Sequence, residues 1–337
     1  MTRILNQLRP VSGAQLQQIT IAPRTAEAHN RLMQDIEAMQ VLEQGGQGTL
    51  PALPNRFHVA AWNVERGIDP FRIATALRAH GPSVLLLSEV DNGMSRTGQR
   101  HVAADIAAEL GMHYLYGVEF LELGLGKGRE RVRCRDDFNK LGFHGNAVLS
   151  SAPISRACLL RLSNDGHWFR IGPDSAGDPE EPRIGDRMAI LAELVTEAGP
   201  ICVVSAHLES NAQPLYRAQQ FDRLMAAVDL FAPCLPVLIG GDLNTGSKVL
   251  PDFDWREEPL FAQAEAQGYS WEGTPEGMTT RASLLSPHPL GPMKLDWFAH
   301  RDLTARPLAV MPALDGQGTP LSDHEAVLCT LDLRAER

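Results

Sequence analysis

From about residue 56 onward the chain consists of short apolar runs separated by turns, and this pattern limits the fold more than any other feature of the sequence. The runs are rich in Val, Ile, Leu and Ala, and several show no alternation of apolar and polar residues. Such runs are typical of strands that are buried on both faces of a sheet. The expected strands are 58–64, 83–90, 146–150, 188–196, 201–207, 236–240, 295–299 and 326–333.

Three segments between these runs are expected to be helices, and they cover 71–80, 100–110 and 215–231. Pro214 stands directly before the third segment, where proline favours the start of a helix. The expected strands outnumber the helices, so the pattern does not indicate a simple alternation of strand and helix. The sequence contains no detectable internal repeat. It therefore predicts an α/β fold with extra strands.

Residues 1–50 differ from the rest of the chain and are expected to form an N-terminal extension that packs on or near a main domain of residues 51–337. Leu32, Met33 and Ile36 have helical spacing, which predicts one helix over 26–42 before the glycine-rich residues 45–48. Two loops also stand out. Residues 122–142 contain six Lys or Arg against four Asp or Glu, and residues 164–186 form an irregular insertion rich in Gly, Pro and Asp.

Charge and cysteine content narrow the class of protein. The formal net charge is −10, which disfavours a protein that grips long duplex DNA through many phosphate contacts. It does not exclude a phosphate ester as ligand, because a bound metal ion can supply local positive charge. The five cysteines are scattered without a C-x-x-C pair, so we expect neither a zinc ribbon nor a disulfide framework. No secretory signal or membrane span is expected, which favours a cytoplasmic location.

Polar side chains follow several apolar runs at the point where each expected strand ends. A carboxylate inside a buried strand is costly unless it is paired or bound to a metal ion, whereas carboxylates at the ends of strands can meet in one cleft. Amide and carboxylate oxygens together with histidines suit a hard divalent cation and a phosphate ligand. The residues in question are Asn63, Glu89, His207, Asp242, Asn244, Asp296, Asp323 and His324.

The residues of these segments and their order along the chain resemble the motifs of the endonuclease/exonuclease/phosphatase superfamily. This superfamily includes deoxyribonucleases, abasic-site endonucleases, inositol polyphosphate phosphatases, sphingomyelinases and deadenylases. The resemblance covers roughly residues 56–334 and implies a four-layer α/β sandwich, in which two facing mixed β-sheets are flanked by helices. The main domain would then be the catalytic domain. The matching segments are WNVERG at 62–67, LLLSEVD at 85–91, HGNAVLSSAPI at 144–154, SAHLES at 205–210, GGDLNT at 240–245, LDWF at 295–298 and LSDHEAV at 321–327.

The resemblance also implies a role for each matching residue. Asn63 and Glu89 correspond to the metal-binding pair, and Asp323 would complete a metal site. Asp242 and Asn244 correspond to the pair that activates the nucleophilic water and holds the scissile phosphate. His207 corresponds to the histidine that stabilises phosphoryl oxygens or handles protons, and Asp296 to the carboxylate that orients His324. Asn146 would bind phosphate through a hydrogen bond, and Arg187 is either a phosphate clamp or a surface ion pair.

The implied activity is hydrolysis of a phosphodiester or phosphomonoester by in-line attack of water, with Mg²⁺ or Mn²⁺ as cofactor. Asp242 and His324 are alternative general bases, and we prefer Asp242. A small or headgroup-type substrate is expected, with an endonuclease or exonuclease acting on DNA or RNA as the alternative. A protein that keeps the fold but only binds phosphoesters is the alternative of another class. The intact Asp242-Leu243-Asn244 and Asp323-His324 segments favour catalysis. The oligomeric state does not follow from the sequence.

Overall fold

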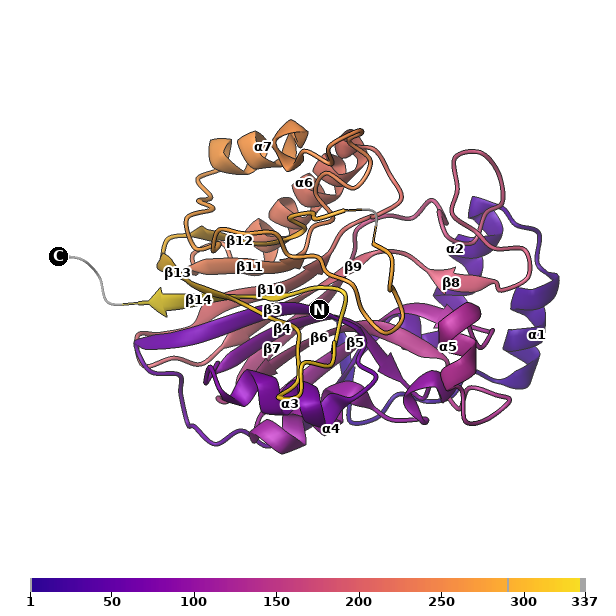
Figure 1. Cartoon of the computed structure of the whole chain (residues 1–337), viewed down its shortest axis with the longest axis horizontal. Helices are drawn as coiled ribbons and strands as arrows, with labels where there is room; N and C mark the ends of the chain where they lie inside the picture. The colour runs from indigo at the N-terminus through magenta and orange to yellow at the C-terminus, as the bar shows by residue number, and fades with distance from the viewer. Residues whose placement is uncertain (1, 290, 334–337) are drawn as a thin grey trace.

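Two β-sheets pack face to face at the centre of the molecule, and helices cover the outer face of each sheet (Figure 1). The structure is a computed structural model, and it describes residues 2–289 and 291–333. The four layers are helices, larger sheet, smaller sheet and helices. Each sheet contains both parallel and antiparallel neighbours. The prediction of a four-layer α/β sandwich with two mixed sheets is therefore confirmed.

The larger sheet has nine strands in the order β1-β2-β5-β6-β4-β3-β14-β13, with β8 pairing to β5. Their bounds are β1 (Arg3–Leu5), β2 (Val41–Gly46), β3 (Arg56–Arg66), β4 (Val84–Asn92), β5 (His113–Glu122), β6 (Phe143–Ser150), β8 (Arg183–Gly185), β13 (Thr304–Met311) and β14 (Ala326–Asp332). The smaller sheet has five strands in the order β12-β11-β10-β9-β7. They are β7 (Ile154–Arg161), β9 (Met188–Leu194), β10 (Ile201–His207), β11 (Val237–Asp242) and β12 (Asp296–Arg301).

The helices fall into three groups around the sheets (Figure 1). The first group covers the larger sheet and consists of α3 (Pro70–Arg78) and α4 (Val102–Leu110), and the second covers the smaller sheet and consists of α6 (Pro214–Phe231) and α7 (Leu260–Ala266). The third lies toward one edge of the larger sheet, with α1 (Gly13–Ile21), α2 (Ala26–Asp35) and α5 (Gly128–Arg133). Three short 3-10 helices cover Glu37–Met39, Ser95–Thr97 and Trp255–Glu257.

Apolar residues on both faces of the central strands explain why these runs do not alternate. In β3, Val59 and Ala61 face the smaller sheet, while Ala60 and Trp62 face the helices of the first group, and all four are fully buried. Each such strand therefore joins two apolar cores and removes apolar surface from water on both sides. Burial on both faces holds the strands in place, and polar side chains are therefore found toward the ends of the strands.

The N-terminal residues depart from the single helix that the spacing predicts. Helix α2 ends at Asp35, a 3-10 turn follows, and residues 41–46 form β2, which lies between β1 and β5 in the larger sheet and pairs Glu43 with Tyr116. Val41 and Leu42 are buried because they belong to this strand, so the prediction that they end the helix is wrong. A second helix, α1, was not predicted, because its hydrophobic side is narrow and only Ile19 is fully buried.

All eight expected strands and the three expected helices of the main domain are present, with ends that move by a few residues. The pattern missed β5, β7 and β13 among the longer strands. Only Ala157 of β7 is buried, β13 contains Pro307, and β5 carries two glutamates, so the sequence of none of these strands is a plain apolar run. Cys202 and Cys329 are buried free thiols. Within the described ranges, no helix is long and apolar enough to cross a membrane.

Candidate active site

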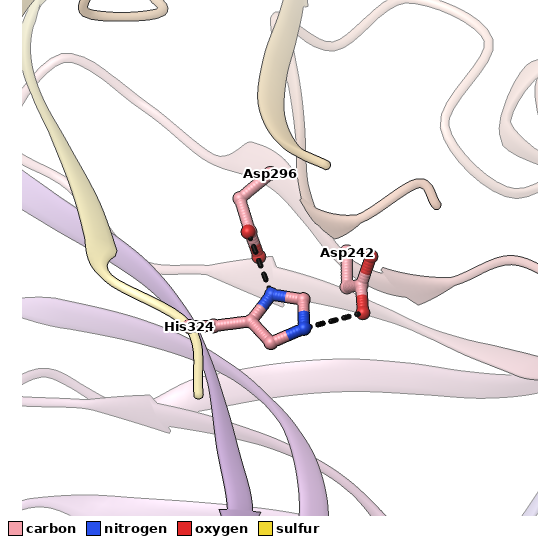
Figure 2. A group of neighbouring side chains, drawn as sticks. All are labelled: Asp242, Asp296 and His324. Carbon is pink, nitrogen blue, oxygen red and sulfur yellow. Dashed lines mark hydrogen bonds and ion pairs between the residues drawn. The ribbon is translucent and has the colours of Figure 1, made fainter. Parts of the chain in front are cut away.

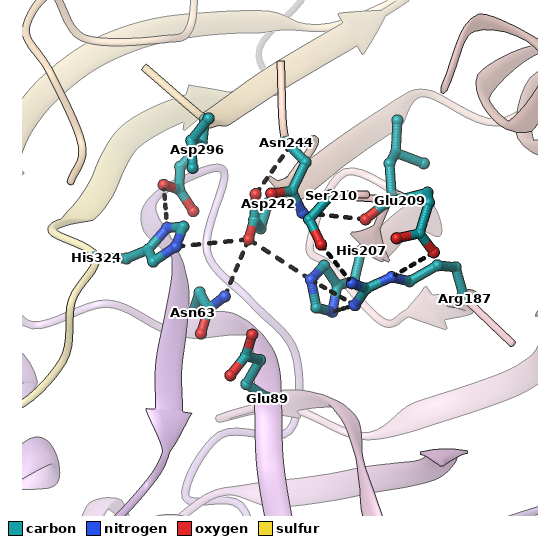
Figure 3. Close-up of polar contacts among 12 residues, drawn as sticks. Asn63, Glu89, Arg187, His207, Glu209, Ser210, Asp242, Asn244, Asp296 and His324 are labelled. Carbon is teal, nitrogen blue, oxygen red and sulfur yellow. Dashed lines mark hydrogen bonds and ion pairs between the residues drawn. The ribbon is translucent and has the colours of Figure 1, made fainter. Parts of the chain in front are cut away.

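The ends of three neighbouring strands of the smaller sheet place their polar residues side by side. Strands β10 and β11 run parallel and end together, so His207 is the direct neighbour of Asp242. Strand β12 runs antiparallel to β11 and begins where β11 ends, which pairs Asp296 with Asp242. His324 precedes β14 in the facing sheet at the same end of the sandwich (Figure 3).

Asp242 lies at the centre of this cluster and is almost completely buried. Its Oδ2 atom accepts a hydrogen bond of 2.9 Å from the side-chain amide of Asn63. The same oxygen lies 3.6 Å from Nε2 of His207 and 3.7 Å from Nε2 of His324. The other oxygen, Oδ1, accepts the backbone N–H of Asn244 at 2.9 Å. One carboxylate is thus reached from both sheets by an amide and two imidazoles (Figure 3).

His324 is held by Asp296 on the side that faces away from Asp242 (Figure 2). Its Nδ1 lies 2.8 Å from Oδ2 of Asp296, and both side chains are buried. Burial raises the pKa of Asp296 to about 6 in spite of the favourable charge of His324. Burial alone would lower the pKa of His324, but the carboxylates of Asp296 and Asp242 outweigh it and hold that pKa well above its ordinary value. The pair therefore keeps a proton at neutral pH.

His207 is held by a second buried carboxylate, Glu119 of β5, whose Oε2 lies 3.0 Å from its Nδ1. Arg187 joins this pair: its Nη1 lies 3.2 Å from Glu119 and 3.0 and 2.9 Å from the two ring nitrogens of His207, so it sits over the ring. Burial would raise the pKa of Glu119, but His207 and Arg187 lower it to about 2. Glu119 is therefore a fixed negative charge.

Arg187 is not a surface residue, and the surface ion pair considered from the sequence is wrong. The residue is 5% exposed. Its Nε donates to Glu209 at 3.3 Å and its Nη2 donates to Ser210 at 3.0 Å. Because protein groups already engage each side of the guanidinium, Arg187 is suited to positioning Glu119 and His207. Glu209 also accepts the indole N–H of Trp168 at 2.8 Å.

Asn63 and Glu89 lie on adjacent strands of the larger sheet at the level of the cluster. The pairing of β3 with β4 is irregular between Asn63 and Arg66, and the pairing of β4 with β6 is irregular between Leu87 and Val90. Glu89 has a φ of 55°, in the left-handed region. Irregular pairing of this kind re-aims side chains and is common beside active sites. The carboxylate of Glu89 forms an ion pair with Arg66.

The remaining three predicted residues surround the cluster. Asn244 donates from its amide to the carbonyl of Leu208 at 3.0 Å and is buried. Asn146 is fully buried opposite the irregularity that contains Glu89, and its Oδ1 has no hydrogen-bond partner among the described residues. The charge of Asp323 raises the pKa of His324, after the larger effects of burial and the two aspartates. The ten predicted residues therefore map to one end of the sandwich.

Two sets of side chains offer donors for a metal ion. Asp242, Asp296 and His324 present ligand atoms that all lie within 4.8 Å of one another. The sequence instead indicated Asn63, Glu89 and Asp323. In the first set, Asp296 and His324 each already use one atom in the hydrogen bond between them. In the second set, the side chain of Glu89 is 21% exposed and already binds a cation, the guanidinium of Arg66. Asn63 and Glu89 offer only oxygen donors, which suit a hard cation, and Oδ1 of Asn63 also accepts the backbone N–H of Glu65 at 3.0 Å.

The sequence profile of the Endonuclease/Exonuclease/phosphatase family matches residues 60–324. The chain belongs to this family. The match runs from within β3 to His324 in the last motif segment, and it includes all ten predicted site residues. Among curated proteins, none matches the sequence.

Solved structures agree with the fold of the family at low sequence identity. An endonuclease/exonuclease/phosphatase from Beutenbergia cavernae is 20% identical, covers 82% of this chain and 72% of its own, and superposes with a TM-score of 0.56. The catalytic domain of human Nocturnin, solved with a bound sulfate anion, is 14% identical, covers 86% and 97%, and has a TM-score of 0.54. A conserved protein of unknown function from Enterococcus faecalis is 14% identical, covers 81% and 98%, and has a TM-score of 0.53.

Three residues of the site, Glu119, Glu209 and Arg66, are not predicted from the sequence. Glu119 interrupts an apolar run of β5 and is fully buried, and a charged residue inside such a run requires a partner. The same two glutamates that make β5 unlike an apolar run also hide this signal in the sequence. Glu209 and Arg66 lie inside the SAHLES and WNVERG motifs, where their neighbours received the roles. Their own contacts depend on β8, α5 and other distant segments.

Proposed function

We propose that this chain is a divalent-metal-dependent phosphoesterase that hydrolyses a phosphodiester or phosphomonoester by in-line attack of water. Members of the family are generally phosphoesterases or nucleases, and the site described above carries the groups that such a reaction needs. The observation that carries the proposal is the position of Asp242, which receives Asn63, His207 and His324 on a single oxygen. Asn63 and the backbone N–H of Asn244 fix this buried carboxylate in place, which is the positioning that a general base for water requires.

The two aspartates that flank His324 indicate which side chain accepts a proton from water and which can donate one. His324 is enclosed by Asp296 and Asp242, which favour its protonated form, and a protonated imidazole cannot accept a proton from water. This leaves Asp242 as the general base. His324 then stabilises negative charge on the phosphoryl group or donates a proton to the leaving oxygen. Asp296 holds the imidazole in place. Asn244 is the proposed contact of the scissile phosphate, together with Asn146, whose side-chain N–H donates to the carbonyl of Met188 when no phosphate is bound.

Asn63 and Glu89 are the proposed holders of Mg²⁺ or Mn²⁺, and Asp323 adds negative charge nearby. A divalent cation bound there would polarise the phosphoryl oxygens and stabilise charge on the leaving group. Arg66 would have to release one oxygen of Glu89, and it remains tied to Glu130 of α5 through a hydrogen bond of 2.8 Å. Helix α5 is therefore connected to the proposed metal ligand by one arginine.

A small or headgroup-type substrate fits the charge distribution better than long duplex DNA. The chain carries a net charge of −10, and its main basic segment is the loop that contains α5. In that loop Lys127 is engaged by Asp178 and Glu180, while Arg131 and Arg135 are exposed. Such a lip can attract one or two phosphates beside the site but offers a poor track for a duplex.

The direct test is a panel of phosphoesters assayed in EDTA, Mg²⁺ and Mn²⁺, with aryl monoesters, aryl diesters, lipid headgroups and nucleic acids as substrates. We expect activity to vanish in EDTA and to return with either metal. Full activity in chelator would contradict the metal dependence. Calorimetric titration with Mn²⁺ separates the two ligand sets: Glu89→Gln should weaken binding far more than Asp296→Asn if Asn63 and Glu89 hold the ion.

The nuclease alternative makes a different prediction. Duplex binders that make 6–10 phosphate contacts lose ~10³- to 10⁵-fold in affinity between 50 and 200 mM salt. Activity of this chain on its best substrate should fall far less over that range. Efficient nicking of intact plasmid with a steep salt dependence would establish the nuclease. Metal and phosphoester binding without turnover of any substrate would establish the binding protein.

A further inference from the structure

Arg66 is a partly exposed cation at the candidate active site, and the reaction proposed above gives it no contact with the substrate. Its side chain is 20% exposed, and that of its partner Glu89 is 21% exposed. The side chains of Asp242 and His324 are only 2% and 9% exposed. The pair of Arg66 and Glu89 therefore lies on the side of the site that a ligand reaches first from solvent.

Strained backbone brings Arg66 and Glu89 together. Glu65 and Arg66, at the end of β3, have φ angles of 43° and 76°, and Glu89 in the neighbouring strand β4 has a φ of 55°. All three lie in the left-handed region, which costs a residue with a side chain conformational energy, and such residues gather at functional sites. Two of the three form the ion pair. The strain therefore places a cation directly against the proposed metal ligand.

A chain of ion pairs holds Arg66 by its Nε atom. Nε donates to Glu130 of α5 at 2.8 Å, and Glu130 also pairs with Arg96 at 3.3 Å. The side chain of Arg96 is 1% exposed and is held in turn by Asp91 at 2.8 Å and by Glu122 at 2.7 Å. A buried polar network with satisfied partners is rigid. Glu130 is therefore a fixed point to which one end of the Arg66 guanidinium stays bound.

The other end of this guanidinium is open to a ligand. Nη1 contacts Glu89, and Nη2 makes no hydrogen bond to a residue that the structure describes. Nη2 is also not one of the buried polar atoms that lack a partner, so it has surface accessible to solvent. The planar fork of an arginine binds phosphate through two parallel N–H groups. Once Glu89 has a different cation, Nη1 is released as well, and the fork is complete.

The position of Glu89 places this fork beside the reacting phosphate. Asn63 lies between Glu89 and Asp242, and its amide donates to Asp242 at 2.9 Å (Figure 3). A phosphoryl group that is attacked by water from Asp242 and neutralised at Glu89 occupies this same span. Arg187 cannot take the part of Arg66, because Glu209, Glu119 and Ser210 already engage its three nitrogens.

We propose that Arg66 is a further substrate-binding residue, which neutralises Glu89 until the metal site is filled and then binds the phosphoryl group through Nη1 and Nη2. The proposal rests on the proposed function, because it takes Glu89 as a metal ligand and places the phosphate beside it. In both states the guanidinium keeps an anionic partner, so no charge at the site is left unpaired. Glu130 and Arg96 are positioning residues, since they act on the substrate only through Arg66.

Two calorimetric titrations test the proposal, because it predicts opposite effects for Arg66→Met. Metal-free protein should bind Mn²⁺ ~5-fold more tightly in the variant, since the internal competitor for Glu89 is lost. Protein loaded with Mn²⁺ should bind inorganic phosphate ~10-fold or more weakly, since two hydrogen bonds to a charged ligand are lost. The value of kcat/KM on the best phosphoester should fall by ~10²-fold.

Arg78→Met is the matched control, because Arg78 is an exposed arginine at the end of α3 that pairs with Glu109. It should change neither binding constant. Arg66→Lys keeps the positive charge beside Glu89 but lacks the fork. It should bind Mn²⁺ as wild type does and bind phosphate with an affinity between those of wild type and Arg66→Met. A thermal melt checks folding, and Arg66→Lys decides the question if Arg66→Met does not fold.

Phosphate affinity equal to that of wild type in Arg66→Lys, and in Arg66→Met where it folds, would overturn the proposal. Weaker Mn²⁺ binding in a folded Arg66→Met would also overturn it, because Arg66 would then support the metal site instead of competing for it. If no phosphoester is hydrolysed but both binding constants change as expected, the proposed function fails and the assignment of Arg66 stands. If phosphoesters are hydrolysed and Arg66→Met keeps the kcat/KM of wild type, the assignment of Arg66 fails alone.

Discussion

Two histidines approach Asp242 from opposite sides with almost the same geometry, yet their surroundings differ. His207 holds Glu119 by Nδ1 at 3.0 Å and faces Asp242 by Nε2 at 3.6 Å. His324 holds Asp296 by Nδ1 at 2.8 Å and faces Asp242 by Nε2 at 3.7 Å. Only the first pair has an arginine, because Arg187 contacts both of its members and has no counterpart beside the second among the described residues (Figure 3).

The presence of Arg187 beside only one pair goes with a difference in pKa between the two carboxylates, Glu119 and Asp296. Burial would raise the pKa of Glu119, but His207 and Arg187 together hold it at about 2, so its charge is permanent. Burial raises the pKa of Asp296 to about 6, and its carboxylate favours the protonated form of His324. The difference teaches that similar histidine–carboxylate pairs can serve as a fixed electrostatic support and as a proton-bearing group, depending on one neighbouring cation.

The largest effect is expected from Asp242→Asn, which removes the group that both pairs share. Activity on the best phosphoester should fall by ~10²- to 10³-fold in kcat, since the general base is lost. Thermal stability should change little or rise, because the neighbouring carboxylate Asp296 repels Asp242 when no metal is bound. Steady-state kinetics and a thermal melt are the measurements, with Asp252→Asn, a change at an exposed residue, as the control. Turnover near that of wild type would remove Asp242 from the role of base.

His324→Ala should lower kcat by ~10²-fold or more, and Asp296→Asn should lower it less, because the imidazole remains but is poorly oriented. The comparison predicts that the double variant behaves like His324→Ala, since Asp296 acts only through His324. A double-mutant cycle on kcat measures this coupling. Additive effects of the two changes would show that Asp296 has a role of its own, for example as a metal ligand with Asp242.

Arg187→Met tests whether the arginine is what distinguishes the two pairs. Glu119 would remain buried without its cation, so its pKa should rise and the protein should lose on the order of 3–5 kcal/mol of stability. We expect kcat to fall by ~10-fold through poorer placement of His207, with KM changing less. Arg187→Lys should restore part of the stability. If KM rises strongly while stability is unchanged, Arg187 is a phosphate clamp instead.

The smallest effect concerns stability in acid. The pKa of Glu119 is about 2 in the folded protein and 4.5 as the ordinary reference, so its ionised form stabilises the fold above pH 4.5. This contribution, about 3 kcal/mol by linkage, is lost as the pH falls from 4.5 toward 2. Glu119→Gln should be less stable than wild type at pH 7, and the difference should shrink in this window. Denaturant unfolding at several pH values measures it; a constant difference would mean Glu119 is not ionised.

The sequence alone determined the strands that are apolar on both faces, and the resemblance of its motif segments indicated the family and most of the candidate site. A strand that is buried on both faces has a continuous apolar sequence, which can be recognised without the structure. A carboxylate at the end of such a strand indicates a binding or catalytic site. His207 and Asp242 are the last residues of such strands, His324 lies just before one, and Asn63 and Glu89 lie within β3 and β4 where the apolar run ends.

Only the tertiary structure decided which groups support these residues. Glu119 and Arg187 lie 68 positions apart, and their contact depends on how β5 packs beside the end of the smaller sheet. The same holds for Glu209 and for Arg66, whose partners Glu89 and Glu130 lie on β4 and α5. A pattern along the chain reports local burial and periodicity, whereas the neighbour that sets the charge of a buried group is chosen by packing between strands distant in sequence.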